Sequence, residues 1–170
     1  SSTGGVLLEN LNIYGNQSTY DGGGIYISEN SGSTTINACK IYDNVCVNGG
    51  GGVWNDEKTI IQNTLLYGNE SQTDGGGIFS HDILILVNST LAYNFIPGGR
   101  YGAAIGLATG LDSLLLLNNI FYQNYSGTVG VAAVNVDNSF YLFDGRLVAY
   151  NNYFQSGDNN LIISRGSGNI

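Results

Sequence analysis

Charged residues are scarce in this sequence. Only 13 of its 170 residues are Asp or Glu and only 5 are Lys or Arg, so 11% are charged, where about a quarter is usual. Because 42% of the residues are hydrophobic, the chain is not of the highly charged, apolar-poor kind that stays disordered. We expect one domain over residues 1–170, with a polar surface built mainly from uncharged amides and hydroxyls.

Other absences narrow the class of protein further. The single proline, Pro97, excludes a proline-rich linker, and no apolar run approaches the length needed to cross a bilayer. Good helix formers are rare, with no Met, whereas Tyr, Ile, Val and Thr are plentiful, which favours an all-β fold. The basic residues form no patch, so we expect neither nucleic-acid binding nor membrane insertion. They are scattered at Lys40, Lys58, Arg100, Arg146 and Arg165.

The abundant residues, 26 Gly and 22 Asn, belong to an internal repeat of about 25 to 30 residues. A Gly-rich corner followed by an apolar residue occurs at 21–26, 49–54 and 74–79, and in altered form at 102–105 and 131–134. An apolar residue followed three positions later by Asn occurs at 13–16, 41–44, 66–69, 91–94, 121–124 and 149–152. A further Asn precedes most of these units, at Asn10, Asn37, Asn63, Asn88 and Asn118.

A repeat of this length with short apolar segments between Gly and Asn corners has no room for an amphipathic helix. An antiparallel sandwich would give turn signals every 8 to 12 residues without such a superperiod. The pattern therefore predicts a parallel β-helix of about six coils with three short strands per coil. In one unit we expect strands at 24–27, 34–37 and 39–42 and a returning loop over 43–50.

Stacked coils place equivalent residues in columns roughly 4.8 Å apart. Alternation along each strand predicts two buried apolar ladders. The first comprises Ile13, Ile41, Leu66, Leu91 and Phe121, and the second Ile25, Val53, Ile78, Ile105 and Val134. We expect the column that starts at Asn10 to turn a tight corner with inward amides that hydrogen-bond along the axis.

The Gly-Gly-Gly-Ile and apolar-x-x-Asn signatures together resemble the polymorphic outer-membrane protein repeats of bacterial autotransporter adhesins and of secreted right-handed β-helix proteins. The resemblance covers the whole chain. It implies a right-handed β-helix displayed outside the cell or on its surface, with an adhesive or scaffolding role.

Residues with catalytic chemistry are few. His81 is the only histidine, no metal-ligand spacing is present, and we expect no metal, no cofactor and no enzymatic activity. Asp21 and Asp74 are weak catalytic candidates, because two coils would separate their backbones by roughly 9.6 Å, near the spacing of inverting glycosidases. The alternative is that each Asp caps its own turn before Gly.

Aromatic residues supply the stronger candidate for a binding surface. Alternation places Tyr26, Trp54 and Phe79 outside at one coil position. Such a strip is either covered by the chain's own loops, a protein interface or a glycan-binding surface. A second set of outward or corner tyrosines is expected nearby, at Tyr14, Tyr42, Tyr67, Tyr122 and Tyr150.

Two kinds of covalent modification are also considered. Cys39 and Cys46 flank one corner and could form a disulfide, the alternative being an unpaired, buried Cys39. Four Asn-x-Ser/Thr sequons begin at Asn16, Asn69, Asn88 and Asn124. We expect Asn88 to point inward and stay unmodified, and the other three to lie at loop starts where glycans are possible.

The leading hypothesis is a non-catalytic extracellular β-helix that acts as an adhesin, surface scaffold or fibre subunit. Its partners would be proteins, including further copies of the chain, bound through the solenoid ends and the aromatic strip. Glycans are a further candidate partner. We expect the solenoid to be open-ended, either a segment of a longer one or a subunit that stacks end to end. The alternative is a carbohydrate-active β-helix that binds or cleaves a polysaccharide.

Overall fold

The computed structural model describes residues 4–98, 102–108, 113–127, 134–136, 146–155 and 161–163, and every regular element in these residues is a β-strand. The strands form four parallel sheets, here named A to D in the order in which the chain visits them. Among these residues no helix is long and apolar enough to span a membrane.

Each sheet collects the equivalent strand from successive coils. Sheet A contains β1 (Val6–Glu9), β5 (Thr34–Asn37), β9 (Thr59–Gln62), β13 (Leu84–Val87), β17 (Ser113–Leu117) and β21 (Arg146–Tyr150). Sheet B contains β2 (Asn12–Tyr14), β6 (Lys40–Tyr42), β10 (Leu65–Tyr67), β14 (Thr90–Ala92), β18 (Ile120–Tyr122) and β22 (Tyr153–Gln155). Sheet C contains β3 (Gln17–Ser18), β7 (Val45–Cys46), β11 (Glu70–Ser71), β15 (Phe95–Ile96) and β19 (Tyr125–Ser126). Sheet D contains β4 (Ile25–Ile27), β8 (Val53–Asn55), β12 (Ile78–Ser80), β16 (Ile105–Leu107), β20 (Val134–Val136) and β23 (Leu161–Ile163).

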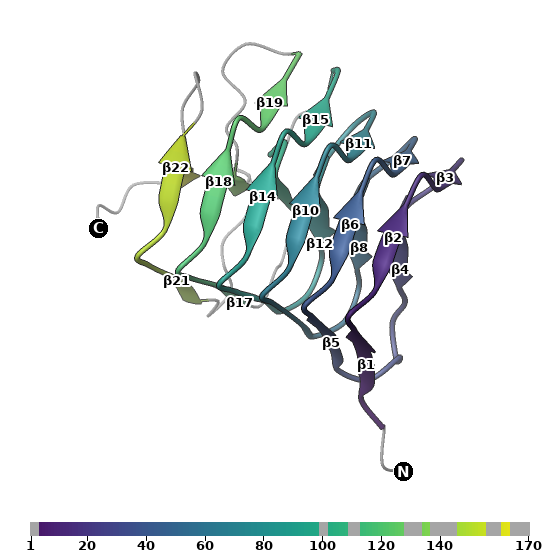
Figure 1. Cartoon of the computed structure of the whole chain (residues 1–170), viewed down its shortest axis with the longest axis vertical. Coiled ribbons are helices and arrows are strands. Elements are labelled where there is room, and N and C mark those ends of the chain that lie inside the picture. The colour runs from purple at the N-terminus through teal and green to yellow at the C-terminus, as the bar shows by residue number, and fades with distance from the viewer. Residues whose placement is uncertain are drawn as a thin grey trace.

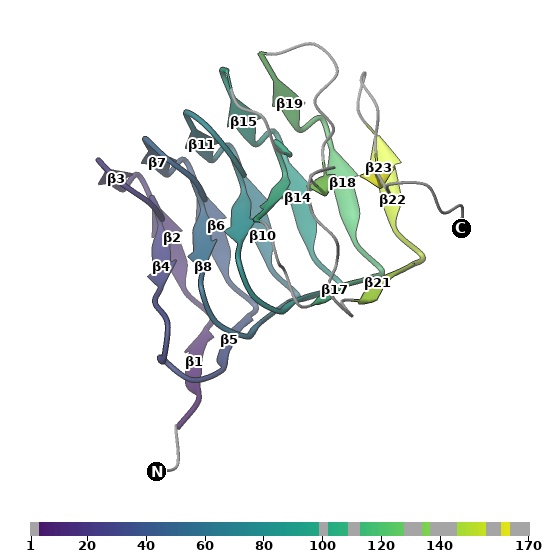
Figure 2. The same ribbon diagram turned by 180° about the vertical axis from the view of Figure 1, so that it is seen from behind.

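The path of the chain makes the solenoid right-handed. In Figure 1 the chain rises through the sheet B strands on the near side and descends through sheet D behind them, while it advances from right to left. Figure 2 shows the same coil from behind, with the sheet D strands in front. The predicted right-handed parallel β-helix is therefore confirmed.

The coil differs from the prediction in two details. It has four strands per turn, because the expected returning loop over 43–50 contains β7, a two-residue strand of sheet C. About four turns, from β1 to β16, are described nearly without a break, and two further turns are represented by strands separated by undescribed residues. The expected strand at 34–37 matches β5, and β4 and β6 each begin one residue later than expected.

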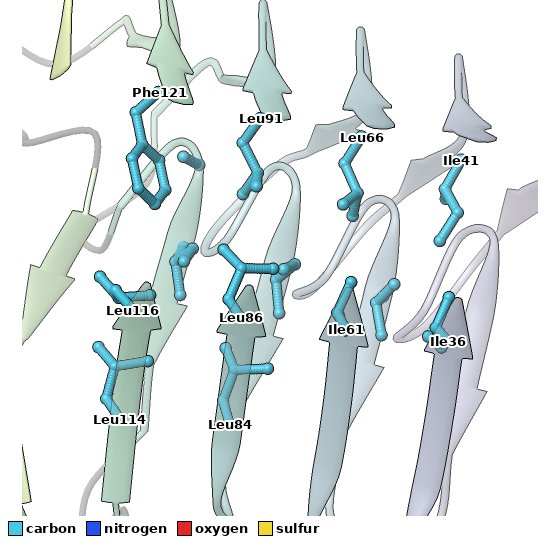
Figure 3. Packing of buried hydrophobic residues seen from close by; sticks show 14 of the residues in the cluster. Ile36, Ile41, Ile61, Leu66, Leu84, Leu86, Leu91, Leu114, Leu116 and Phe121 are labelled. Atoms are coloured by element: carbon cyan, nitrogen blue, oxygen red, sulfur yellow. The ribbon is translucent and has the colours of Figure 1, made fainter. Parts of the chain in front are cut away.

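Both predicted apolar ladders are present. Ile13, Ile41, Leu66, Leu91 and Phe121 are in register along sheet B. The column from Ile25 to Val134 is in register along sheet D. Figure 3 shows Ile41, Leu66, Leu91 and Phe121 of the sheet B ladder beside a sheet A ladder. The sheet A ladder comprises Ile36, Ile61, Leu86 and Leu116, all fully buried. The core is thus a set of continuous apolar columns enclosed by the sheets.

Two constraints require glycine at the corners between sheets C and D. Gly22, Gly50 and Gly75 are equivalent and have φ of 61°, 70° and 59°, a region that other residues rarely adopt. Two residues later the backbones of neighbouring coils touch, so that a Cβ on Gly52 would lie 2.6 Å from the carbonyl oxygen of Gly77. The repeated Gly triplet therefore allows successive coils to approach closely.

The predicted Asn column turns the corner between sheets A and B, but on the outside. Asn10, Asn63, Asn88 and Asn118 have φ between 49° and 56°, and their side chains are exposed. Asn37 is not in this column: Ala38 has the equivalent conformation, with φ of 52°, and Asn37 pairs with Glu9. The amides do hydrogen-bond between coils, as from Asn63 Nδ2 to Asn37 Oδ1 at 3.0 Å. The prediction of an inward column, including an inward Asn88, is wrong.

The buried Asn column belongs to the apolar-x-x-Asn element instead. Asn44, Asn69 and Asn94 are fully buried between sheets B and C. The backbone nitrogen and Nδ2 of Asn44 both donate to Asn69 Oδ1, at 3.2 and 3.0 Å, and Asn69 donates in the same way to Asn94. Asn69 Nδ2 also donates to the carbonyl oxygen of Ile41, at 2.9 Å. Each internal amide therefore donates twice and accepts twice, which satisfies its hydrogen-bonding capacity.

Asn69→Ala is expected to lower the free energy of unfolding by at least about 2 kcal/mol, because it leaves buried donors on Asn44 without their acceptor and removes the Nδ2 donor to Ile41 O and Asn94 Oδ1. The matched control is Asn63→Ala, which changes an exposed amide at a position where Ala38 already stands in the preceding coil. We expect the control to lose about 1 kcal/mol or less. Urea unfolding followed by circular dichroism measures both, and equal losses would contradict the assignment of the buried column.

Candidate functional site

An open groove lies where three consecutive coils turn from sheet D towards sheet A. It has a volume of about 580 Å³. Trp54 lies within β8, and the other lining residues follow strands of sheet D. The lining comprises Glu29, Asn30, Trp54, Asp56, Glu57, His81 and Asp82. The stacking of coils therefore gathers on one surface side chains that are separated by about 25 residues in the sequence.

Backbone hydrogen bonds between coils extend beyond sheet D and set the position of the polar residues. Asp56 N donates to the carbonyl oxygen of Ile27, at 3.0 Å, and His81 N donates to that of Asn55, at 2.8 Å. Asp56 and His81 are consequently equivalent residues of adjacent coils. Their side chains meet, with His81 Nδ1 at 2.7 Å from Asp56 Oδ1. The other oxygen of Asp56 accepts a hydrogen bond of 3.2 Å from the Tyr26 hydroxyl.

The predicted strip of Tyr26, Trp54 and Phe79 forms one side of this region. The three residues are in register on adjacent strands, and their rings stack with centroid distances of 6.3 and 4.9 Å. Tyr26 is 54% exposed, Trp54 is half-buried and Phe79 is only 7% exposed. His81 packs edge-on against Trp54 and Phe79. The chain itself therefore covers Phe79, whereas Tyr26 and Trp54 remain accessible to a partner.

Stacking determines which part of each ring is available to a ligand. Trp54 has an aromatic neighbour on both faces, Tyr26 on one side and Phe79 on the other. Its faces are therefore partly covered, and the strip presents mainly ring edges and the outer face of Tyr26. Partial desolvation, followed by the charge and hydrogen bond of Asp56, raises the pKa of the Tyr26 hydroxyl, so it stays a neutral donor at physiological pH.

The electrostatic character of the groove is acidic. Four of its seven lining residues are carboxylates and none is Lys or Arg. Glu57 Oε2 accepts a hydrogen bond of 2.9 Å from Asn30 N, and Asp82 accepts one from Ile83 N, which fixes these two side chains in place. Within the described residues no group of three or more His, Cys, Asp or Glu is arranged to hold a metal ion. The arrangement is suited to holding a basic group at the surface.

Asp21 and Asp74 lie elsewhere, at the corner between sheets C and D. Gly49 is paired with Asp74 and lies between the two acids in the stack, as the predicted spacing of two coils requires. Serines contribute to both turns, because Ser18 Oγ and Ser71 Oγ donate to the carbonyl oxygens of Asp21 and Asp74, at 3.0 and 2.7 Å. Neither acid lines the groove, and Asp21 Oδ1 is buried without a hydrogen-bond partner in the described structure.

Cys39 and Cys46 are both buried and unpaired, so the predicted alternative of a disulfide between them is not formed. Cys39 belongs to the core at the corner between sheets A and B. Cys46 occupies the position of Ser18 and Ser71 and, like them, donates to the corner, with Sγ at 3.2 Å from the carbonyl oxygen of Gly49. Burial raises the pKa of the Cys46 thiol to about 11, and the nearby Asp21 carboxylate adds to the shift.

The second tyrosine column is shorter than expected. Tyr14, Tyr42 and Tyr67 stack with centroid distances of 4.8 Å and nearly parallel rings. Ala92 follows in register, and Tyr122 lies beyond it in the same sheet. Tyr150 was expected near this column, but it lies in sheet A opposite Leu117, so that expectation is wrong.

The sequons are also placed differently from the expectation. Asn69 and Asn124 are buried members of the Asn column, so the expectation that they lie at accessible loop starts is wrong. Asn16 is exposed, and its Nδ2 donates to Asn44 Oδ1 at 2.9 Å. Asn88, expected to point inward, is exposed.

Sequence reasoning did not identify most of the groove. Asp56, His81 and the acids beside them occupy a coil position with no repeated residue type, so no motif marked it. The signal in the sequence was the spacing from the outward aromatic residues. Two or three positions after each of them come Glu29, Asp56–Glu57 and His81–Asp82.

The fold defines the chain as a right-handed parallel β-solenoid. Comparisons with protein-family models, with curated proteins and with solved structures find no match.

The raised pKa of Cys46 predicts a loss of stability at alkaline pH. In the unfolded chain the thiol loses its proton near its ordinary pKa of 9.0, whereas the native thiol keeps it until about pH 11. Stability is therefore fully present below pH 9 and falls as the pH rises to 11, by about 2 to 3 kcal/mol from this group. Urea unfolding at pH 8, 9, 10 and 11 should show the fall.

Cys46→Ser is the matched variant, since Ser occupies this position at Ser18 and Ser71. In this variant the fall in stability caused by ionisation of tyrosines should remain. The fall caused by ionisation of the Cys46 thiol should be absent. Identical pH profiles for the two proteins would contradict the assignment.

Proposed function

We propose that this chain is a non-catalytic β-solenoid that works as an adhesive or scaffolding segment outside the cell or on its surface. The observation that carries the proposal is the lateral groove, in which Trp54 and the paired Asp56 and His81 are held in fixed positions by neighbouring coils. A fixed, partly aromatic and accessible surface on a rigid stack is suited to binding a macromolecular partner. The external location rests on the resemblance of the repeats to those of autotransporter adhesins.

A protein partner with basic side chains fits the groove best. Carboxylates without a Lys or Arg among them attract positive charge, and complementary charge favours encounter with such a partner. Sugar rings usually bind to open aromatic faces, and both faces of Trp54 are partly covered by its neighbours. This is the reason for preferring a basic protein segment over a glycan.

A second contact surface is proposed at the first coil, for a further copy of the chain. Within the described residues β1, β2 and β4 are each paired on one side only, with β5, β6 and β8. The exposed side chains there include Val6, Leu7 and Leu11, with Leu7 61% exposed. An open parallel edge beside apolar side chains favours the addition of another coil.

The alternative is a carbohydrate-active solenoid. It is favoured by the size of the groove and by the Asp56–His81 pair, which combines a carboxylate with an imidazole at 2.7 Å. Asp21 and Asp74 give it less support, because they lie at another corner and Asp21 Oδ1 is buried.

Trp54 is the only tryptophan, so its fluorescence reports directly on the groove. We expect an arginine-rich peptide to change the emission in a saturable, salt-sensitive manner. Glu57→Gln should weaken this binding several-fold, because it removes one charge from the groove lining. Glu9→Gln removes the same charge from the corner between sheets A and B and should leave binding unchanged.

The alternative is tested in the same assay with neutral and acidic oligosaccharides, together with a reducing-sugar assay on polysaccharides. Binding of an oligosaccharide but not of the peptide would favour the carbohydrate-active solenoid. Turnover that is abolished by Asp56→Asn or Asp74→Asn would overturn the non-catalytic proposal. If neither the peptide nor an oligosaccharide binds, the groove is not the lateral binding surface.

End-to-end contact predicts a molar mass that rises with protein concentration in sedimentation equilibrium. Leu7→Ser should reduce the association several-fold, because Leu7 is exposed beside the unpaired edge of β1. Val47→Ser, which changes an exposed residue of the second coil in the loop between sheets C and D, is the control. A constant monomer mass over the whole series would contradict the proposed contact.

A further inference from the structure

The four sequons differ in whether their amide nitrogen is available. Nδ2 of Asn69 donates to Ile41 O and Asn94 Oδ1, and Nδ2 of Asn124 donates to Leu91 O, all within the buried column. Nδ2 of Asn16 donates to Asn44 Oδ1. In these three sequons the atom that would carry a glycan is engaged in the hydrogen bonds that join coils.

Asn88 is the exception. It lies at the exposed corner between β13 and β14, with φ of 49°. Its Oδ1 accepts a hydrogen bond of 3.1 Å from Asn118 Nδ2, and its own Nδ2 donates to no group among the described residues. The side chain is thus anchored by its oxygen while its nitrogen faces solvent. Thr90, which completes the sequon, is half-buried at the start of β14.

From this geometry we infer that Asn88 is an acceptor site for an N-linked oligosaccharide. In the transfer, Nδ2 forms a bond to C1 of the sugar of a lipid-linked oligosaccharide pyrophosphate. The bond from C1 to the pyrophosphate oxygen breaks, the lipid pyrophosphate leaves, and one amide proton passes to a base of the transferring enzyme. The product keeps Asn88 Oδ1 as a carbonyl oxygen, so the hydrogen bond from Asn118 persists.

The position of Asn88 leaves the rest of the surface usable. The groove residues His81 and Asp82 precede β13, and Asn88 follows it, so the two sites lie at opposite ends of the same strand. A glycan at Asn88 therefore projects from the corner between sheets A and B, away from the groove. The inference goes beyond the proposed function and relies only on passage through a glycosylating secretory route.

The test expresses the full chain behind a secretory leader in eukaryotic cells and maps occupancy in the secreted, folded protein by peptide mass spectrometry after glycosidase treatment. Wild type should carry a glycan at Asn88, and Thr90→Ser should keep it at equal or several-fold lower occupancy. Thr90→Val should abolish it while preserving the side-chain shape. Asn88→Asp, which keeps the oxygen that accepts from Asn118 but removes Nδ2, should abolish it independently.

Secreted protein without a glycan at Asn88 would overturn the inference, as would glycans mapped to Asn69 or Asn124 in folded protein. A β-rich circular dichroism spectrum identifies the folded fraction of each variant. The peptide titration of the groove is a separate measurement, so the two proposals can fail independently.

Discussion

The structure depends on one constraint: every residue of a coil lies against its equivalent in the next coil, at the spacing of hydrogen-bonded strands, about 4.8 Å. The Tyr14, Tyr42 and Tyr67 rings, stacked at 4.8 Å, show this spacing directly. A position in the coil must therefore suit a residue type that tolerates its own copies as neighbours. Apolar side chains, amides and aromatic rings do so, whereas like charges repel, which accounts for the scarcity of charged residues.

The same constraint explains how much of the fold was predictable. A position occupied by one residue type in every coil leaves a visible period in the sequence, and the ladders headed by Ile13 and Ile25 were identified in this way. The Gly corners were identified because neither positive φ nor the contact between coils at Gly52 tolerates a side chain. The short strands of sheet C were missed, because two residues such as Val45 and Cys46 are too few to show alternation.

The errors arose where a period does not specify the direction of a side chain. Two Asn columns have the same spacing, and which one is buried depends on a left-handed residue at each corner. Asn10 itself adopts that conformation and points outward, whereas Asn16 follows Gly15, with φ of 65°, and starts the inward column. The groove was missed for the opposite reason: Asp56 and His81 differ in type, so stacking unites them without leaving a repeat.

The inward Asn column also gives the solenoid a direction. Between the amides, one Nδ2 hydrogen donates to the following coil and Oδ1 accepts from the preceding one, from Asn44 through Asn69 and Asn94 to Asn124. The amide dipoles are therefore aligned head to tail, with their positive ends towards the C-terminal coils, as in a helix macrodipole. A coil added to either end continues this chain of hydrogen bonds only in the same orientation. The end-to-end contact proposed above would therefore be polar and non-closing, unlike the contact of a symmetric dimer.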